Sequence, residues 1–167
     1  LVVALLAGAE QMAALFALSL PLDAHPWTFA TSVYAHTGPW HLLSNLALFA
    51  LLGLAVERKT SPTEFHLFVL LTGATANVAQ VAFSNLVGSV DAHVLGLSGA
   101  VFALLGYVLT GNRLTGFVLD RFDISHGVQL ATAEPGVALV GHFTGLFLGL
   151  VLGAGAVLED DGIDERP

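Results

Sequence analysis

Two polar residues flanked by glycines stand out in an almost wholly apolar chain. Ser98 lies in the run Gly-Leu-Ser-Gly, and His142 lies in the run Gly-His-Phe-Thr-Gly. A serine hydroxyl becomes a nucleophile when a neighbouring imidazole accepts its proton, so this pair could attack a carbonyl carbon. The two runs therefore predict hydrolytic chemistry, provided that the fold brings Ser98 and His142 together.

A second polar pair, His41 and Asn45, follows Pro39, which suits the first turn of a helix. Residues four apart share one face of a helix, so two hydrogen-bond donors converge there. Taken alone, such a pair is more often a packing contact between helices. We expect His41 and Asn45 to act with Ser98 and His142, because all four residues would lie at the same depth, near the outer surface of the membrane.

The amino-acid composition indicates whether these residues lie in water or in a lipid membrane. Of 167 residues, 55% are hydrophobic and 11% are charged, and the mean hydropathy is +0.79. Soluble domains carry about 25% charged residues, so the chain is expected to be an integral membrane protein. The absence of cysteine excludes disulfides and thiolate metal sites. Without an HExxH pattern, a phosphate-cradling loop or a basic aromatic patch, we expect no metal, no cofactor and no nucleic-acid partner.

A membrane-spanning helix needs about 20 mainly apolar residues. The stretches that approach this length are 1–22, 40–56, 65–87, 94–111 and 136–158. No basic region precedes the first stretch, so we expect it to be a retained span rather than a cleavable signal. The chain is thus predicted to be an all-α, polytopic membrane helix bundle.

The basic residues predict the orientation of the bundle, because they collect in cytoplasmic loops. They follow the second and fourth stretches and the last one, and are absent from 23–39 and 84–93. Those two segments are expected to face outward. Residues 1–158 would form the transmembrane domain, and the acidic residues 159–167 a solvated, disordered tail. The prediction is a multi-pass protein of the cell membrane with its site on the extracellular side.

One of the expected membrane crossings, over residues 112–135, lacks a continuous apolar stretch. Residues 112–135 must return the chain to the outer side, yet charged residues interrupt them. Each charge at the centre of a bilayer costs about 3 kcal/mol on insertion scales. The part after Arg121 is short for a helix that must cross about 30 Å at 1.5 Å per residue. We expect a weak or shortened fifth helix here.

Small residues recur along the two segments that carry Ser98 and His142. The first segment has a stripe of Gly99, Ala103 and Gly106, and the second has a glycine every four residues: Gly141, Gly145, Gly149 and Gly153. Gly96 and Gly99 also permit a tight approach to the helix start at Ser98, where unpaired N–H groups could hold an oxyanion. The spacing predicts two closely packed helices with Ser98 and His142 at their ends.

Four motifs occur in order along nearly the whole chain: His36…His41-x-x-x-Asn45, Gly53-Leu54-Ala55-Val56-Glu57-Arg58, Gly96-Leu97-Ser98-Gly99 and Gly141-His142-x-x-Gly145-x-x-x-Gly149. This set resembles the rhomboid family of intramembrane serine proteases. The chain has one lysine and thirteen acidic residues, a composition that we expect of a prokaryote from a high-salt habitat. The resemblance implies a six-helix core with a water-filled cavity open to the outside.

The resemblance also implies residue roles. Ser98 would be the nucleophile and His142 the general base and acid, with no carboxylate partner. His41, Asn45 and the Ser98 backbone N–H would stabilise the oxyanion. Phe102 stands where relatives often have a tyrosine against the catalytic histidine, and it keeps the stacking surface.

The expected function is a serine endopeptidase that cleaves transmembrane segments of single-span proteins in the lipid bilayer; the oligomeric state stays open. One alternative is a catalytically inactive rhomboid-like protein that binds membrane clients. Another is a transporter that uses intramembrane histidines, but the paired carboxylates and repeated broken helices of such proteins are absent from the sequence.

Overall fold

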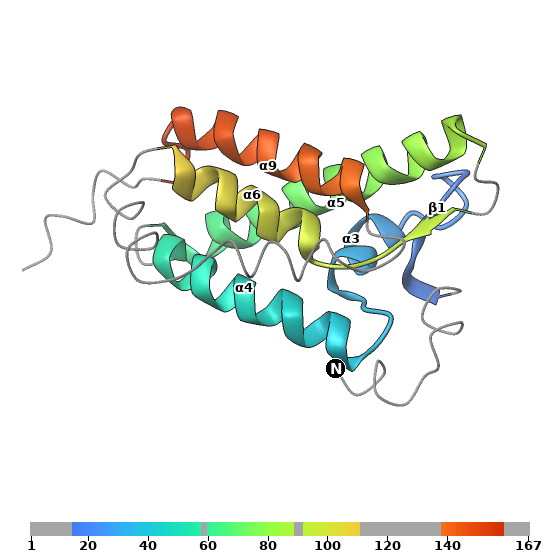
Figure 1. The fold of residues 1–167 in the computed structure, drawn as a ribbon, viewed down its shortest axis with the longest axis horizontal. Coiled ribbons are helices and arrows are strands. Elements are labelled where there is room, and N and C mark those ends of the chain that lie inside the picture. The colour runs from blue at the N-terminus through green and yellow to red at the C-terminus, as the bar shows by residue number, and fades with distance from the viewer. Residues whose placement is uncertain (1–14, 58–59, 89–91, 111–137, 159–167) are drawn as a thin grey trace, which may run out of the picture.

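The computed structural model describes residues 15–57, 60–88, 92–110 and 138–158. Most of these residues are helical (Figure 1). In chain order the elements are β1 (Leu18–Ser19), α3 (Thr28–Tyr34), α4 (Pro39–Glu57), α5 (Pro62–Leu86), β2 (His93–Val94), α6 (Ser98–Leu109) and α9 (Leu139–Ala154). The described part is therefore an all-α bundle with one short antiparallel strand pair added.

Four of the predicted stretches are helical. Helices α4 and α5 match the predicted stretches 40–56 and 65–87, and both are long and apolar enough to cross a membrane. Helices α6 and α9 are shorter apolar helices, and both begin later than predicted. Before α6, His93 and Val94 form strand β2 instead of a helical turn. The later start leaves Ser98 as the first residue of α6.

The prediction of a helical span over 1–22 is wrong at its C-terminal end. Leu18 and Ser19 form β1, which pairs antiparallel with β2 in the register Leu18 to Val94 and Ser19 to His93. Leu18 is fully buried in this pairing, so its apolar character reflects tertiary packing rather than a membrane helix. Residues 1–14 lie outside the described residues. So do the predicted fifth crossing at 112–135 and the acidic tail at 159–167.

Local sequence explains where two helices begin. Pro39 is the first residue of α4, as predicted, because its fixed φ suits a first helical turn. Helix α5 begins with a capping box: Ser61 accepts a hydrogen bond from the Glu64 N–H, and the Glu64 carboxylate accepts one from the Ser61 N–H. These bonds satisfy donors that a helix start would otherwise leave unpaired.

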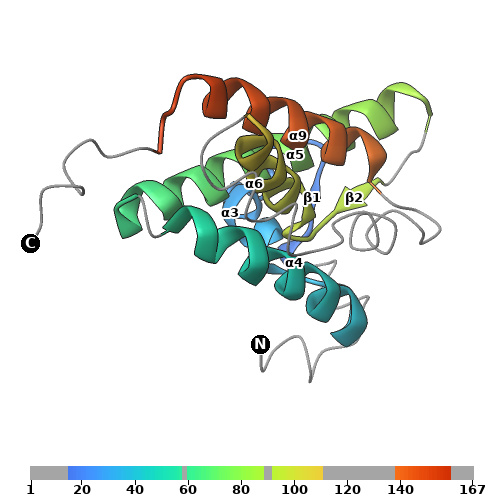
Figure 2. The same ribbon diagram turned by 60° about the vertical axis from the view of Figure 1, so that its left-hand side comes forward.

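Helix α6 is the centre of the bundle. Every residue from Gly99 to Val108 is buried. Helices α9, α5 and α4 all contact it, and α6 runs between α9 and α4 in the views of Figures 1 and 2. A helix that is apolar on all sides and enclosed by others is a core helix.

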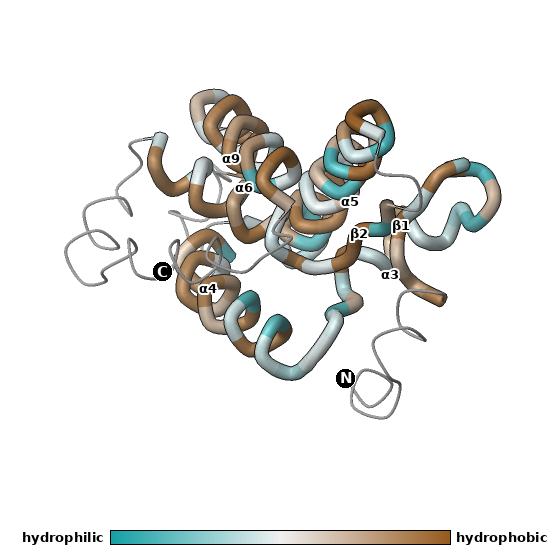
Figure 3. Tube along the Cα trace, turned by 45° about the vertical axis from the view of Figure 1, so that its right-hand side comes forward, coloured by the Kyte–Doolittle hydropathy of each residue, from teal (hydrophilic) through white to brown (hydrophobic). Residues whose placement is uncertain are grey.

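The outer helices expose apolar side chains. On α9, Phe143 and Phe147 are 70% and 66% exposed, and on α4, Leu43 and Leu54 are 55% and 56% exposed. Figure 3 shows hydrophobic residues along the lengths of α4, α6 and α9. Apolar surface of this extent is the expected outer face of a membrane helix bundle.

The short helix α3 lies in the segment 23–39, for which no helix was predicted. Its Thr28, Ser32 and Val33 are buried, and it contacts α5 and α6. A segment predicted to face outward thus contributes to the packing around the start of α6.

Candidate active site

Ser98 is the first residue of α6 and is half-buried. The segment before it makes a sharp approach through Gly96, whose φ is +133°. A residue with a Cβ rarely adopts such a φ, so glycine is needed here. The Gly96 N–H donates a hydrogen bond of 2.8 Å to the Ser32 carbonyl, which ties this approach to α3.

His142 lies in the first turn of α9 and is buried, with 6% of its surface exposed. Its Nε2 atom is 2.8 Å from the Ser98 Oγ atom. This distance suits a hydroxyl that donates to an imidazole nitrogen, the arrangement of a serine and its general base. The structure thus brings together Ser98 and His142, which lie 44 positions apart in the sequence.

The glycines of α9 make this approach possible. A methyl group on Gly145 would collide with the Gly99 carbonyl, and one on Gly149 would collide with the Ala103 carbonyl. Two backbones are therefore in direct contact along α6 and α9, as the small-residue stripes predicted. Gly141 differs from the others, because it packs against Ala76 and Gln80 of α5 rather than against α6.

The imidazole of His142 lies flat against the Phe102 ring. The ring centroids are 4.4 Å apart and the planes differ by 10°. Phe102 is one turn after Ser98 on α6 and is itself buried. It therefore limits the rotation of the imidazole beside the serine.

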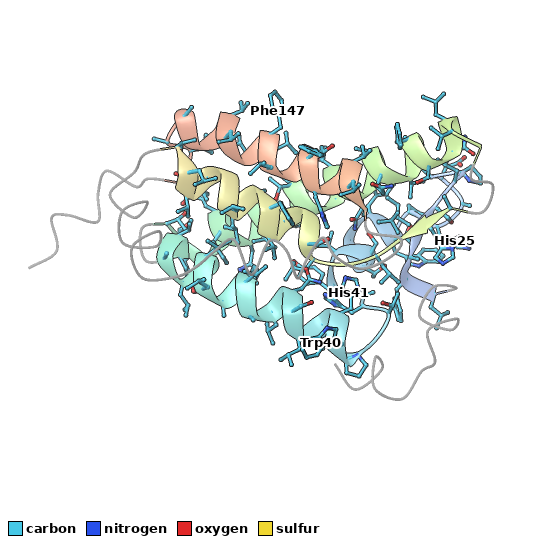
Figure 4. All side chains as sticks on the ribbon, in the orientation of Figure 1. His25, Trp40, His41 and Phe147 are labelled. Carbon is cyan, nitrogen blue, oxygen red and sulfur yellow. The ribbon has the colours of Figure 1, made fainter. Side chains whose placement is uncertain are left out.

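His41 lies next to the approach to Ser98. A Cβ on Gly96 would be 3.0 Å from Cε1 and 3.1 Å from Nε2 of His41, and 3.9 Å from the Ser98 Oγ. The Nδ1 atom on the other side of the imidazole is 3.1 Å from Thr37 Oγ1. In Figure 4, His41 lies on the side of α4 that faces α6, whereas Trp40 lies on the outer side.

Asn45 lies one turn beyond His41 on α4 and is buried. Its Nδ2 atom donates to the His41 carbonyl at 2.8 Å. An amide nitrogen carries two N–H groups, so this bond uses one of two donors. The structure places both predicted donors, His41 and Asn45, on successive turns of one helix.

A family model for the Rhomboid domain matches residues 23–158 of this chain. The chain belongs to the rhomboid family. This membership confirms the resemblance that the four sequence motifs indicated.

Three curated relatives are similar to this rhomboid. Rhomboid protease GlpG of Haemophilus influenzae is 26% identical over 140 residues, which are 78% of this chain and 70% of that protein. The Rhomboid protease GlpG of Photorhabdus laumondii is 27% identical over 143 residues, and that of Yersinia pestis is 28% identical over 135 residues. These two matches cover 75% of this chain but 46% of each relative, so the rhomboid spans about half of their length.

His36 is a buried neighbour of His41 in this rhomboid, and from the sequence it was predicted only as part of a motif. Its Nδ1 atom is 3.2 Å from the Tyr34 carbonyl, and its ring meets the His41 ring edge-on at 5.0 Å. Burial, and secondarily the neighbouring His41, lower the pKa of His36 from 6.5 to about 4. The imidazole is therefore neutral at pH 7.

Three further polar residues around the site were not predicted. Gln80 of α5 accepts a 3.1 Å hydrogen bond from the Gly141 N–H, next to His142. Asn77 of the same helix donates to the Ser32 hydroxyl at 3.1 Å. Asn77 and Gln80 are three residues apart in an apolar helix and so share a face. That pattern is a signal that could have indicated a buried polar contact from the sequence.

The described part of the site places a serine hydroxyl in contact with a buried imidazole. His142 is stacked, buried and bonded to Ser98, and its Nδ1 atom has no hydrogen-bond partner among the described residues. Nowhere in the part of the chain that the structure describes do three His, Asp or Glu side chains gather as metal ligands would.

Proposed function

We propose that this rhomboid is an intramembrane serine endopeptidase that hydrolyses peptide bonds in transmembrane segments of membrane proteins. The observation that carries the proposal is the 2.8 Å contact between His142 Nε2 and Ser98 Oγ within an apolar helix bundle. Family membership and relatives named rhomboid protease support the same activity. The inactive client-binding alternative has no observation in its favour.

The proposed reaction begins when Ser98 attacks the carbonyl carbon of the scissile bond. His142 accepts the hydroxyl proton at Nε2 and then gives it to the leaving amine. The carbonyl carbon stays bound to Ser98 as an ester, the acyl-enzyme. Water, activated by the same imidazole, then attacks the ester and releases the carboxylic acid.

The oxyanion formed in each step needs hydrogen-bond donors. We assign this role to His41, Asn45 and the backbone N–H of Ser98. The place of the His41 ring beside Gly96 supports the assignment, because a Cβ added at Gly96 would lie within 4 Å of both the His41 imidazole and the Ser98 hydroxyl. In a low-dielectric site, loss of one such donor typically costs about 3 kcal/mol of transition-state stabilisation.

The finer parts of the proposal concern topology and partners. We propose a six-helix core in which a short fifth crossing lies between α6 and α9, in residues that the structure does not describe. The site would open to the extracellular side of the cell membrane. Its substrates would be single-span membrane proteins, which reach the site through the lipid bilayer.

The test is labelling of Ser98 by a fluorophosphonate, together with cleavage of a model transmembrane substrate in liposomes. Ser98→Ala and His142→Ala are both expected to lose labelling and cleavage. Thr144→Val is the matched control, because the Thr144 hydroxyl donates to the Val140 carbonyl within its own helix, α9. Binding of the substrate without labelling of the wild type would contradict the proposal and favour the client-binding alternative.

A further inference from the structure

A buried polar bond links two segments that the proposed reaction does not use. The Asn77 side chain of α5 donates from Nδ2 to the Ser32 hydroxyl of α3 at 3.1 Å. Ser32 is fully buried and Asn77 is 4% exposed. A polar contact in such surroundings is costly to break, because each partner would lose a bond that water cannot replace.

The same serine also holds the approach to the nucleophile. The Ser32 carbonyl accepts the 2.8 Å hydrogen bond from the Gly96 N–H, two residues before Ser98. Gly96 also lies beside the His41 ring, since a Cβ added at Gly96 would be 3.0 Å from His41 Cε1. Ser32 thus bonds through its side chain to α5 and through its backbone to the segment that carries the nucleophile.

Close packing supports this arrangement from α5. Gly73 is one turn before Asn77, and a Cβ on it would lie 2.9 Å from Val33 Cγ1 and 3.3 Å from the Ala100 Cβ. The backbone of α5 therefore lies directly against both α3 and the first turn of α6. Asn77 is presented to Ser32 from a rigid element rather than from a loop.

We propose that Ser32 and Asn77 form a positioning pair that sets the place of the Gly96–Ser98 segment relative to His41 and His142. This inference rests on the proposed serine-protease function. Neither residue touches the substrate in this account. Their effect is on alignment, and misplacement of reacting groups by about 1 Å can cost about 100-fold in rate.

The test compares Ser32→Ala, Asn77→Ala and the double variant with the wild type in liposomes. Ser32→Ala removes the hydroxyl but keeps the backbone carbonyl that Gly96 uses. Thr72→Val is the matched control: Thr72 is a buried hydroxyl on α5 whose bond, to the Phe68 carbonyl, stays within its own helix. Melting midpoints are measured for every variant, so that activity is expressed per folded molecule.

Each single variant is expected to lower kcat and the rate of Ser98 labelling by about 10- to 100-fold, with KM within about twofold of the wild type. The double variant is expected to be no slower than the slower single variant, because the two residues share one bond. Thr72→Val is expected to keep the wild-type kcat. If Asn77→Ala does not fold, Ser32→Ala decides by itself.

Two results would overturn the positioning pair. Wild-type kcat per folded molecule in the single variants would leave the proposed function standing and remove the inference. So would effects that multiply in the double variant, since they would show independent sites. A wild type that neither labels nor cleaves would instead refute the proposed function, and the positioning role with it.

Discussion

The imidazole of His142 and the ring of Phe102 are stacked, with centroids 4.4 Å apart and planes 10° from parallel. Stacked aromatic pairs contribute about 0.5–1.5 kcal/mol beyond the area that they bury. We expect Phe102→Leu to lower kcat by roughly 2- to 10-fold, because the imidazole would gain freedom beside Ser98. Steady-state cleavage measures this effect. Phe102→Tyr keeps the ring and should keep most of the activity; equal losses in both variants would contradict a role for stacking.

The contact between Gly145 and the Gly99 carbonyl predicts a large effect on stability. Gly145→Ala places a methyl group against backbone that cannot rotate away. Overpacking of this kind costs about 1–3 kcal/mol, so the melting midpoint should fall and Ser98 labelling should weaken. Gly155→Ala is the control, since a Cβ at Gly155 makes only ordinary contacts, the nearest at 3.5 Å. Similar midpoints for the two variants would argue against close packing of α6 on α9.

The bond from the Gly141 N–H to Gln80 Oε1 predicts a role for Gln80 in holding the start of α9. Gln80→Leu removes the acceptor from a first-turn N–H, which costs about 1–3 kcal/mol when the group stays buried. Because His142 is the next residue, we expect a lower melting midpoint together with a lower kcat. Differential scanning fluorimetry and substrate cleavage measure the two effects. Ser84→Ala, which removes only the partner of Gln80 Nε2, should have a smaller effect on both.

The buried His36 predicts that the fold is less stable in acid. Its pKa is lowered from 6.5 to about 4 by burial and by His41. Between these two values the unfolded chain binds more protons than the folded chain, so the free energy of unfolding decreases as the pH falls from about 6.5 to about 4. We expect the melting midpoint to fall over this range. In His36→Asn this contribution should disappear.

Replacement of the exposed His25 by asparagine controls for the loss of an imidazole as such. It should leave the acid sensitivity of the fold unchanged. A His36→Asn variant whose midpoint follows the wild-type pH profile would show that His36 is not the group responsible.

The helices were largely predictable from the sequence, because a membrane restricts the possible structures. Apolar stretches near the length of a span can only be helices in lipid, unless they close into a barrel. Pro39 indicated the start of α4, and the glycine spacing indicated that α6 and α9 pack closely. The same reasoning failed at Leu18, which is apolar because it is buried in a strand pair.

The residue types of the site were also predictable, since serine, histidine and glycine are conspicuous in an apolar chain. The partners of those residues were less so. Gly141 packs against α5 rather than α6. Ser32 and Asn77, which are 45 positions apart, form a bond that no spacing indicated.

The sequence by itself determined that this is a membrane protein, where most of its helices lie, and that Ser98 and His142 are the side chains capable of hydrolytic chemistry. Only the tertiary structure decided that His142 Nε2 lies 2.8 Å from Ser98 Oγ and that α3 supports the approach to the nucleophile. The reason is physical. Periodicity and composition specify which face of a helix is buried, whereas the identity of the neighbour on that face depends on how all the helices pack at once.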